Sequence, residues 1–375
     1  MRIRPSRFLA LAALTLSTFS CAATSAAPKA PQAAPPPAQA PAAPIPASAQ
    51  APQQAAPAGP RVRLLATGGT ISNRQGGRLT AEELIKSMPA VTRYATPEFE
   101  QFANVASSAI TLQQWLELAR RINTIYREDA AIAGIVVTSG TDTLEETAYF
   151  LNLTVRDPRP VVVVGSMRNP STLGYEGAAN LLEGFRVAAD PASRNRGALV
   201  VLNDEINSAR EVTKTDALRL QTFQTRGYGI LGVVDSDRVA YFRRGEKRHT
   251  AASEFDVFAI PELPRVDVLL TYQGAPGDLI KAAVDAGAKG IVLATAGAGA
   301  TSGTQGDGIQ YAISKGVPVV TTTRTGSGRI AGGGGGTSLR IAGEGLAPIK
   351  ARILLMLALA TTKDAAQLRR IFSEY

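Results

Sequence analysis

Histidine and cysteine are almost absent from this chain. Its 375 residues include one histidine, His249, and one cysteine, Cys21. Because zinc sites draw their ligands mainly from these residue types, a Cys/His zinc site is excluded, and we expect no metal or other cofactor. A Ser-His-Asp triad would have to use His249. That residue lies in the basic stretch RRGEKRHT and is expected to be solvated, so a hydrolase of this sequence would use another general base.

The leader lacks an apolar run of membrane-spanning length. The run Phe8–Phe19 has 12 residues, whereas a helix that spans a bilayer needs about 20. Arg2, Arg4 and Arg7 precede this run, and small residues follow it. The pattern predicts a secretory signal peptide over residues 1–25, and therefore a secreted or periplasmic bacterial protein.

Two alternatives stay open for Cys21. Cleavage beyond it would leave a mature protein without cysteine, whereas lipidation would anchor the protein to a membrane. The small Ser20 suits lipidation, but Thr18 stands where lipoprotein signals usually carry an aliphatic residue. The Ala/Pro-rich segment 26–60 has Lys29 as its only charge. It cannot bury enough apolar surface to offset ordering, which predicts a disordered tether.

The positive net charge is modest once the leader is set aside. The whole chain carries +9, but four of its 40 basic residues lie in the leader, which has no acidic residue. The remainder has 36 basic and 31 acidic residues, a net charge of +5. No basic run with interleaved aromatic residues occurs there, so we expect no nucleic-acid partner, and no membrane contact beyond a lipid anchor.

Short uninterrupted apolar runs alternate with helical patterns from Arg61 onward. Such runs are typical of parallel strands covered by helices on both faces. The predicted strands of this first region are Val62–Ala66, Ile135–Thr138, Val161–Val164 and Ala198–Leu202. The repeated strand–helix–strand order predicts an open α/β sheet.

A charged, proline-containing segment, 246–264, predicts a linker between an N-terminal α/β domain, 61–245, and a C-terminal α/β domain, 265–375. The glycine-rich segment Gly326–Gly336 predicts a mobile loop. The strands and helices predicted for the second domain are Val266–Leu270, Asp278–Ala286, Ile291–Ala294, Gly308–Lys315, Val317–Thr321 and Pro348–Thr361, in which Pro348 suits a first helical turn.

Two of four candidate motifs contain threonine beside glycine, each just after a predicted strand, where open α/β sheets bind ligands. The first is TGGT, ending at Thr70. Its alternative interpretation is a simple turn or an anion cradle for a nucleotide. The dinucleotide-binding fingerprint itself is absent, because no third glycine follows at the required offset. The second is SGTD, with Thr141 and Asp142 after Gly140. Here the alternative is a helix cap worth about 1 kcal/mol.

The other two motifs carry a serine and a lysine. A strand ends in Gly165-Ser166, which alternatively is a plain strand-to-loop turn. Lys214 lies between two threonines in REVTKTDA, and its alternative role is that of a solvated surface charge. Together the four motifs supply a hydroxyl nucleophile, an amine base, a carboxylate to hold that amine, and backbone donors for an oxyanion. Burial can lower a lysine pKa enough for the amine to act as a base.

The segments ATGGTIS and SGTDTLEETAYFLNLTV together resemble the bacterial secreted (type II) L-asparaginases. The resemblance extends from Arg61 to Tyr375 and includes VVVVGSMR, EVTKT, KARILLMLALA and IFSEY. It implies an α/β fold in two domains, with a larger N-terminal open mixed, mostly parallel sheet and a smaller C-terminal parallel α/β domain. It also implies a cofactor-independent amidohydrolase that cleaves L-asparagine, with L-glutamine as a second substrate, and a homotetramer with its sites between paired subunits.

The same resemblance implies a role for each matching residue. Thr70 matches the nucleophile, Lys214 the proton acceptor, and Thr141 a hydroxyl relay and oxyanion donor. Asp142 matches the partner of the substrate α-ammonium. The remaining implied substrate-binding residues are Ser107 for the α-carboxylate with Ser108 beside it, Ser166 through its backbone carbonyl, and the turn glycines Gly69 and Gly140.

The chain departs from the family pattern in four places. Ser139 replaces a usual histidine, and the lid segment ISNRQGGRLT is short and lacks a tyrosine. No acidic residue occurs between Arg324 and Glu344, where the family carries a glutamate that reaches the neighbouring site, and YQGAPGD lacks the expected asparagine. These departures predict weak recognition of the α-amino group, and hence a high KM or an altered side-chain preference. They also leave open a secreted amino-acid-binding protein or a catalytically weakened sensor, although binding alone does not need Lys214 and the hydroxyls.

Overall fold

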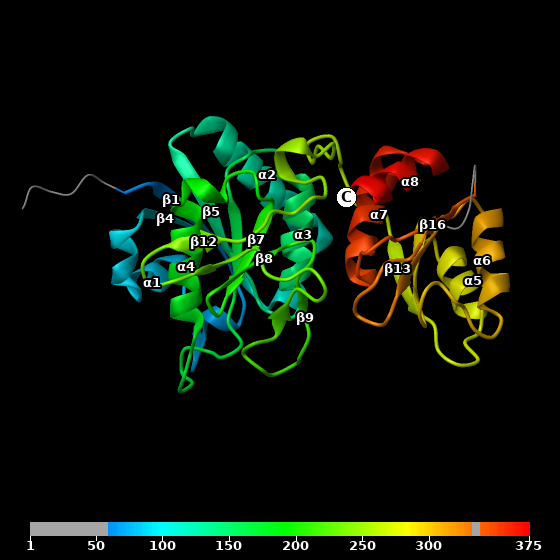
Figure 1. Ribbon diagram of the computed structural model, residues 1–375, viewed down its shortest axis with the longest axis horizontal. Helices are drawn as coiled ribbons and strands as arrows, with labels where there is room; N and C mark the ends of the chain where they lie inside the picture. Colours follow the sequence, from blue (N-terminus) through cyan, green and yellow to red (C-terminus); the bar gives the residue numbers. More distant parts are fainter. Residues whose placement is uncertain (1–58, 332–337) are drawn as a thin grey trace, which may run out of the picture. The chain divides into compact units, whose positions relative to one another are not determined.

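The computed structural model describes residues 59–331 and 338–375 (Figure 1). The predicted signal peptide, Cys21 and nearly all of the predicted tether lie outside the described residues, as do residues 332–337 of the glycine-rich segment. Within the described ranges, none of the helices combines the length and the apolar character that crossing a bilayer requires.

The first sheet has eight strands in the order β12-β11-β8-β7-β6-β5-β1-β4. Five neighbouring strands are parallel: β1 (Arg61–Gly68), β4 (Thr96–Val105), β5 (Ile132–Thr138), β6 (Val161–Val164) and β7 (Ala198–Leu202). The antiparallel extension consists of β8 (Glu205–Ser208), β11 (Gly232–Val234) and β12 (Val239–Tyr241). The predicted mixed, mostly parallel sheet is therefore confirmed.

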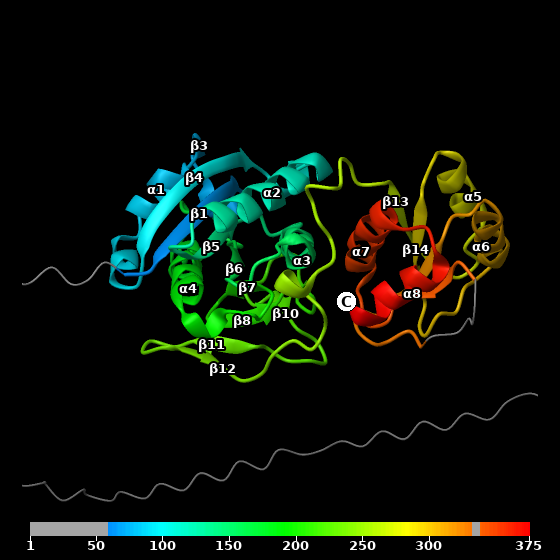
Figure 2. The same ribbon diagram turned by 90° about the horizontal axis from the view of Figure 1, so that it is seen from above.

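Helices cover both faces of this sheet (Figure 2). On one face, α1 (Ala81–Lys86) and α4 (Gly177–Ala189) pack on the strands. On the other lie α2 (Leu112–Glu128) and α3 (Leu144–Thr154). Both α1 and α2 begin with a capping box, in which a threonine and the side chain three residues later satisfy free backbone N–H groups. This double cover explains why β5, β6 and β7 are apolar without alternation.

The chain reverses its direction of travel across the sheet at β1. From β1 it crosses through α1 to β4, and then through α2, on the opposite face, to β5 on the other side of β1. In open α/β sheets such a reversal leaves a crevice outside the carboxyl ends of the strands. The turns after β1, β4 and β5 therefore meet at this point of the sheet.

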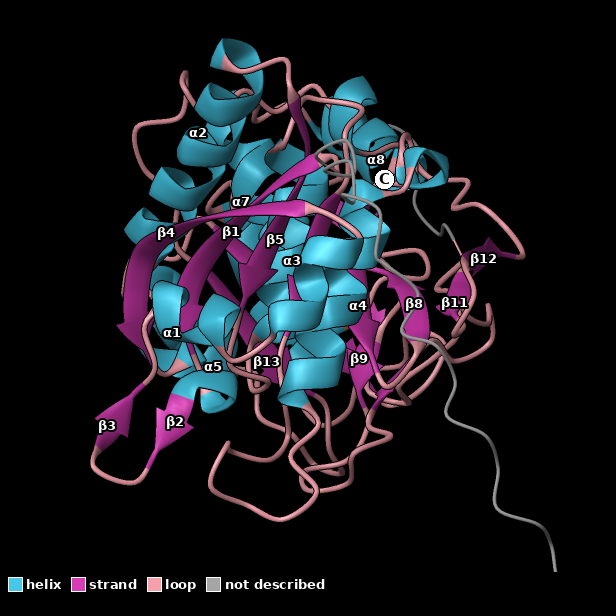
Figure 3. Ribbon diagram, turned by 90° about the vertical axis from the view of Figure 1, so that its left-hand side faces the viewer, coloured by secondary structure: helices cyan, strands magenta, loops and turns pink. Residues whose placement is uncertain are grey.

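Two short hairpins lie beside the carboxyl ends of these strands. The first pairs β2 (Asn73–Arg74) with β3 (Gly77–Arg78) in the segment after Thr70, and projects from the sheet in Figure 3. The second pairs β9 (Thr213–Lys214) with β10 (Phe223–Gln224). The β9 strand fixes the backbone of Lys214 in a ladder, because Lys214 lies opposite Phe223.

The second sheet is fully parallel, as predicted. Its strands are β13 (Val266–Leu270), β14 (Gly290–Thr295), β15 (Val319–Thr323) and β16 (Arg340–Ala342), in that spatial order. One face packs against α5 (Asp278–Asp285) and α6 (Gln305–Ser314), and the other against α7 (Pro348–Thr361) and α8 (Ala365–Glu374). Pro348 occupies the first turn of α7, as expected.

The segment predicted as a linker is well packed. Phe255 and Ile260 are buried in the same apolar cluster as Tyr375, the last residue of the chain. His249 is half-buried rather than solvated, because its ring lies near Gly197 and its Nδ1 is 2.8 Å from the hydroxyl of Thr250. Burial lowers the pKa of His249. The expectation of a solvated histidine is therefore wrong.

Candidate active site

The turn after β1 fits tightly against the turn after β5. Gly68 and Gly69 have φ values of 103° and 89°, a region in which side chains are strained. A β-carbon at Gly69 would lie 2.2 Å from the backbone nitrogen of Gly140, and one at Gly68 would lie 2.5 Å from backbone atoms of Val105. The close approach of two backbones therefore requires glycine, and it brings the TGGT and SGTD motifs into direct contact.

The two threonines of the TGGT motif have different surroundings. Thr67 is buried, and its hydroxyl donates a 2.6 Å hydrogen bond to the carbonyl of Thr138 on β5. Thr70 begins a 3-10 helix over Thr70–Ser72 and is half-exposed. Its hydroxyl takes part in none of the hydrogen bonds between side chains and other groups in residues 59–331 and 338–375. Thr67 therefore joins two strands, whereas the hydroxyl of Thr70 is available for chemistry.

The turn after β5 faces the lysine of β9. The ammonium of Lys214 donates to the hydroxyl of Thr141 at 3.1 Å and to Oδ1 of Asp142 at 2.8 Å. The side chain of Lys214 is 16% exposed and that of Asp142 is 74% exposed. The interpretation of Lys214 as a solvated surface charge is therefore wrong. The capping alternative is also wrong, because α3 has Thr143 at its N-cap, without a side-chain capping bond.

A buried carboxylate holds the backbone on which Lys214 is mounted. Oε1 of Glu145, on the first turn of α3, accepts from the hydroxyl of Thr213 at 2.9 Å and from the backbone N–H of Lys214 at 3.0 Å. Glu145 is 5% exposed. The helix that follows Thr141 and Asp142 thus also fixes the strand that carries their lysine partner.

The predicted substrate-binding serines occupy three different environments. Ser107, in the turn after β4, is buried against the SGTD turn, because a β-carbon at Gly140 would lie 2.8 Å from its Oγ. Ser108 is exposed. Ser166, after β6, is buried and its hydroxyl donates to the carbonyl of Arg168 at 2.6 Å. The neighbouring carbonyl of Gly165 accepts from Nδ2 of Asn180 at 2.9 Å.

The structure thus gathers predicted residues from the carboxyl ends of four parallel strands and from β9. Among the described residues, no group of three or more His, Cys, Asp and Glu side chains is arranged to hold a metal ion. The polar groups that converge here are hydroxyls, one amine, one carboxylate and the N–H groups of glycine-containing turns. Such a set can attack an acyl carbon and stabilise the resulting oxyanion.

Three residues that support this set are not marked by any of the four sequence motifs. The hydroxyl of Tyr175 donates to the carbonyl of Ile71 at 2.9 Å, directly after Thr70. The roles of Glu145 and of Lys350, a fully buried lysine near it, also escaped notice. The only signal for Lys350 was a charged residue in the otherwise apolar helix PIKARILLMLALAT, and nothing in that pattern names its partner.

Comparison with known proteins identifies both halves of the chain. Residues 61–247 match the family described as asparaginase, N-terminal, and residues 265–372 match the glutaminase/asparaginase C-terminal domain. L-asparaginase 2 of Bacillus subtilis (strain 168) is 42% identical over 327 residues, which cover 84% of this chain and 87% of that protein. A probable periplasmic L-asparaginase of Haemophilus influenzae is 37% identical over 328 residues, covering 84% of this chain and 93% of that protein.

A solved structure shows the same fold. The crystal structure of a probable cytoplasmic L-asparaginase from Campylobacter jejuni is similar with a TM-score of 0.78 and 38% sequence identity. The similarity covers 85% of this chain and 100% of that chain. It therefore spans both sheets.

Proposed function

Because the chain belongs to the asparaginase family, we propose that it hydrolyses the side-chain amide of L-asparagine to L-aspartate and ammonia through an acyl-enzyme formed on Thr70. The observation that carries this proposal is the contact of Lys214 with Thr141 and Asp142, beside the turn that presents the Thr70 hydroxyl. A hydroxyl attacks an amide only when a base removes its proton. Lys214 is the amine in this cluster.

The reaction proceeds in two stages. The Thr70 oxygen attacks the amide carbon, while its proton passes through the Thr141 hydroxyl to the amine of Lys214. Backbone N–H groups of the glycine turn stabilise the tetrahedral oxyanion. The C–N bond then breaks, and the nitrogen leaves as ammonia with the proton returned from Lys214. Water, deprotonated by the same amine, attacks the ester and releases aspartate and the Thr70 hydroxyl.

The remaining residues position the substrate. Ser107 binds the α-carboxylate, with Ser108 at the exposed edge, and Asp142 attracts the α-ammonium. The backbone carbonyl of Ser166 accepts from the amide NH2. L-Glutamine is a second substrate, because one additional methylene changes binding by only about 1–3 kcal/mol.

An amino-acid-binding protein is the disfavoured alternative. An amino acid can be bound without the hydrogen bond between the mostly buried Lys214 and the Thr141 hydroxyl. It can also be bound without the unbonded hydroxyl of Thr70 beside that pair. An ammonia-release assay with asparagine separates the two functions, since a binding protein produces none.

The proposal extends to export and assembly. The arginine-rich start and the apolar run Phe8–Phe19 favour secretion or periplasmic location. One relative is named as periplasmic and the similar solved structure as cytoplasmic, so cell fractionation is the required test. We propose a homotetramer on the basis of the family resemblance, and light scattering of the purified protein would measure its mass.

The first prediction tests the nucleophile. Thr70→Ala should lower kcat/KM for ammonia release by at least roughly 1,000-fold, because the attacking oxygen is removed. Quenched wild-type enzyme should show an acyl adduct by mass spectrometry on the peptide that contains Thr70. Thr67→Val is the matched control: it removes a hydroxyl three residues away that only joins two strands, and should keep activity. Full turnover by Thr70→Ala would show that the assigned nucleophile is wrong.

A further inference from the structure

We propose that Lys350, on α7, is a positioning residue for Lys214 and acts together with Glu145 to hold the segment Arg210–Lys214 in place. The inference rests on the proposed role of Lys214 as the base. Lys350 does not touch the candidate reacting groups, but it contacts the backbone that leads to them. Because α7 packs on the second sheet, the C-terminal half of the chain helps to position the base of the same subunit.

The ammonium of Lys350 is fully enclosed by protein. Lys350 is 1% exposed, and its Nζ donates to the carbonyl of Arg210 at 3.1 Å and to the carbonyl of Val212. Its third neighbour is Oε2 of Glu145, at 3.6 Å. A buried charge is costly unless it is paired and hydrogen-bonded, so these partners account for the presence of a lysine in an apolar helix.

Glu145 connects this ammonium to Lys214. Its Oε1 accepts from Thr213 and from the backbone N–H of Lys214, as described above. Its Oε2 is buried and has no hydrogen-bond partner among the described residues. Lys350 faces that oxygen and balances the carboxylate charge that the low-dielectric surroundings leave unscreened.

The backbone before Lys214 is therefore held by two different sets of bonds. Lys350 binds the carbonyls of Arg210 and Val212, and Glu145 binds the N–H of Lys214. The Lys214 side chain extends from this fixed strand to Thr141. Because proton transfer depends on distance, a shift of the strand by about 1 Å is enough to lower turnover strongly.

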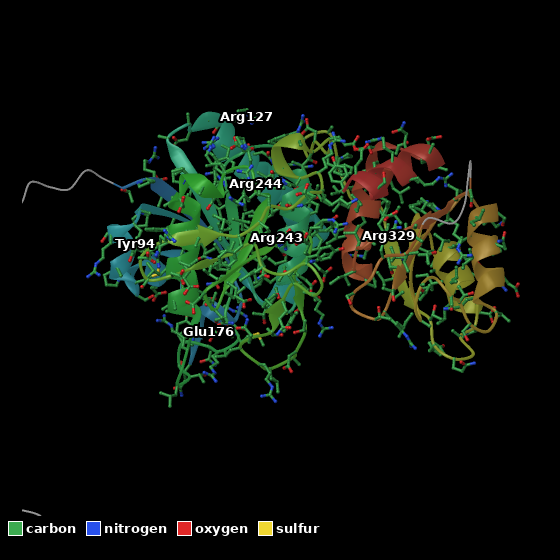
Figure 4. The ribbon with its side chains drawn as sticks, viewed as in Figure 1. Tyr94, Arg127, Glu176, Arg243, Arg244 and Arg329 are labelled. Atoms are coloured by element: carbon green, nitrogen blue, oxygen red, sulfur yellow. The ribbon has the colours of Figure 1, made fainter. Side chains whose placement is uncertain are left out.

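Two further charged residues lie close to Lys350. Arg210 is buried and donates to the carbonyl of Tyr375. Glu211 pairs with Arg243 at 2.5 Å; Arg243 is labelled in Figure 4. A small cavity of about 40 Å³ lies beside Lys350. The charged and titratable groups that face Lys350 or line this cavity are Glu145, Glu146, Arg210, Glu211, Arg226 and Tyr228. Burial lowers the pKa of Lys350 to about 8, against the opposing effect of Glu145.

The test compares Lys350→Met with Arg352→Met, a matched truncation on the same helix. The Arg352 guanidinium donates to the carbonyl of Val266 and lies 3.9 Å from the carboxylate of Glu146, and it forms no hydrogen bond with the segment Arg210–Lys214 among the described residues. We expect Lys350→Met to lower kcat for asparagine by about 10- to 100-fold with little change in KM, since it displaces the base but touches no substrate-binding residue. Arg352→Met should stay within about twofold of wild type. Wild-type kcat should also fall above about pH 8 as Lys350 loses its charge, and this alkaline decline should be absent in Lys350→Met.

A double variant, Lys350→Met/Glu145→Gln, separates positioning from folding. It removes both charges and keeps an amide oxygen that can accept from Lys214, so it should fold, as shown by its thermal midpoint, yet retain the low kcat. A folded single or double variant with wild-type kcat and pH profile would overturn the inference. Lys214→Met is measured in parallel. If it keeps activity, the proposed function of Lys214 fails, and the inference fails with it for that separate reason.

Discussion

Glu183, on α4, is a carboxyl whose charge is suppressed in the folded protein. It is 7% exposed, and its Oε2 accepts from the backbone N–H of Asp204 at 3.1 Å. Burial, followed by the hydrogen bond and negative charge of the Asp204 side chain, raises the pKa of Glu183 to about 7. The folded protein therefore retains a proton that the unfolded chain releases near pH 4.5. The contribution of this proton to the free energy of unfolding is complete below the pKa of Glu183 in the unfolded chain, and it is lost as the pH rises to about 7.

The second prediction follows for this residue. Glu183→Gln keeps the shape and the acceptor but cannot titrate, so its free energy of unfolding should fall less than that of wild type between about pH 4.5 and 7. Urea unfolding at several pH values measures this slope. Glu117→Gln, at an exposed position on α2, is the control and should keep the wild-type slope. Equal slopes for Glu183→Gln and wild type would contradict the prediction.

At the scale of elements, the turn that carries Thr70 is held by a residue that lies outside the TGGT motif. Tyr175, just before α4, donates through its hydroxyl to the carbonyl of Ile71, and burial raises the pKa of Tyr175, which keeps it a neutral donor. The N-cap residue of α4, Glu176, labelled in Figure 4, accepts from the backbone of Met167 after β6. The segment before α4 thus connects the turns after β1 and β6.

The third prediction concerns this connection. Tyr175→Phe removes one hydrogen bond and should lower the free energy of unfolding by about 1 kcal/mol. It should also lower kcat a few-fold, because the Thr70 turn is held less firmly. Tyr94→Phe is the control. The guanidinium of Arg186 lies over the ring of Tyr94, which is labelled in Figure 4, and the Tyr94 hydroxyl has no hydrogen-bond partner within the described ranges. Unchanged kcat in a Tyr175→Phe protein of reduced stability would show that the bond serves only folding.

The helices and strands whose bounds were predicted correctly are those with a clear sequence pattern. The observed bounds of β6, β7, β13 and α7 coincide with the predicted ones. β6 and β7 are continuous buried runs and α7 opens with proline, whereas β13 is only partly buried. The strand β4 was missed. It lies at the sheet edge, none of its residues is buried, and its Glu98 and Glu100 pair with Arg63 and Arg121, so it contains no continuous apolar run. The strands β8, β11 and β12 are too short to show a period.

The site was predictable only in its residue types. Glycine, threonine and lysine motifs were visible because each lies within a few residues of a strand end. Residue types and spacing alone could not distinguish the bonded Thr67 from the unbonded Thr70, because the difference depends on a contact with β5; only the family resemblance singled out Thr70. The pairing of Glu145 with Lys350 joins the two halves of the chain and leaves no local pattern.

At the scale of the whole molecule, recognition of the substrate α-ammonium depends on which acidic groups reach it. The family resemblance implies a glutamate from the C-terminal domain of a neighbouring subunit. No acidic residue occurs between Arg324 and Glu344. Glu344 itself is 21% exposed and forms an ion pair at 2.8 Å with Arg329, which is labelled in Figure 4. Its charge is therefore already engaged within its own subunit, and Asp142 is the acidic group proposed for the ammonium.

The fourth prediction is that this enzyme discriminates weakly for the α-amino group. Asp142 is largely exposed and already bonded to Lys214, so its attraction for an ammonium is screened and shared. The KM for L-asparagine should lie well above the low micromolar range. The analogue of asparagine that lacks the α-amino group should lose no more than about tenfold in kcat/KM, which corresponds to about 1.4 kcal/mol. A low micromolar KM, or a loss of several hundredfold with the analogue, would show that another anionic group completes the site.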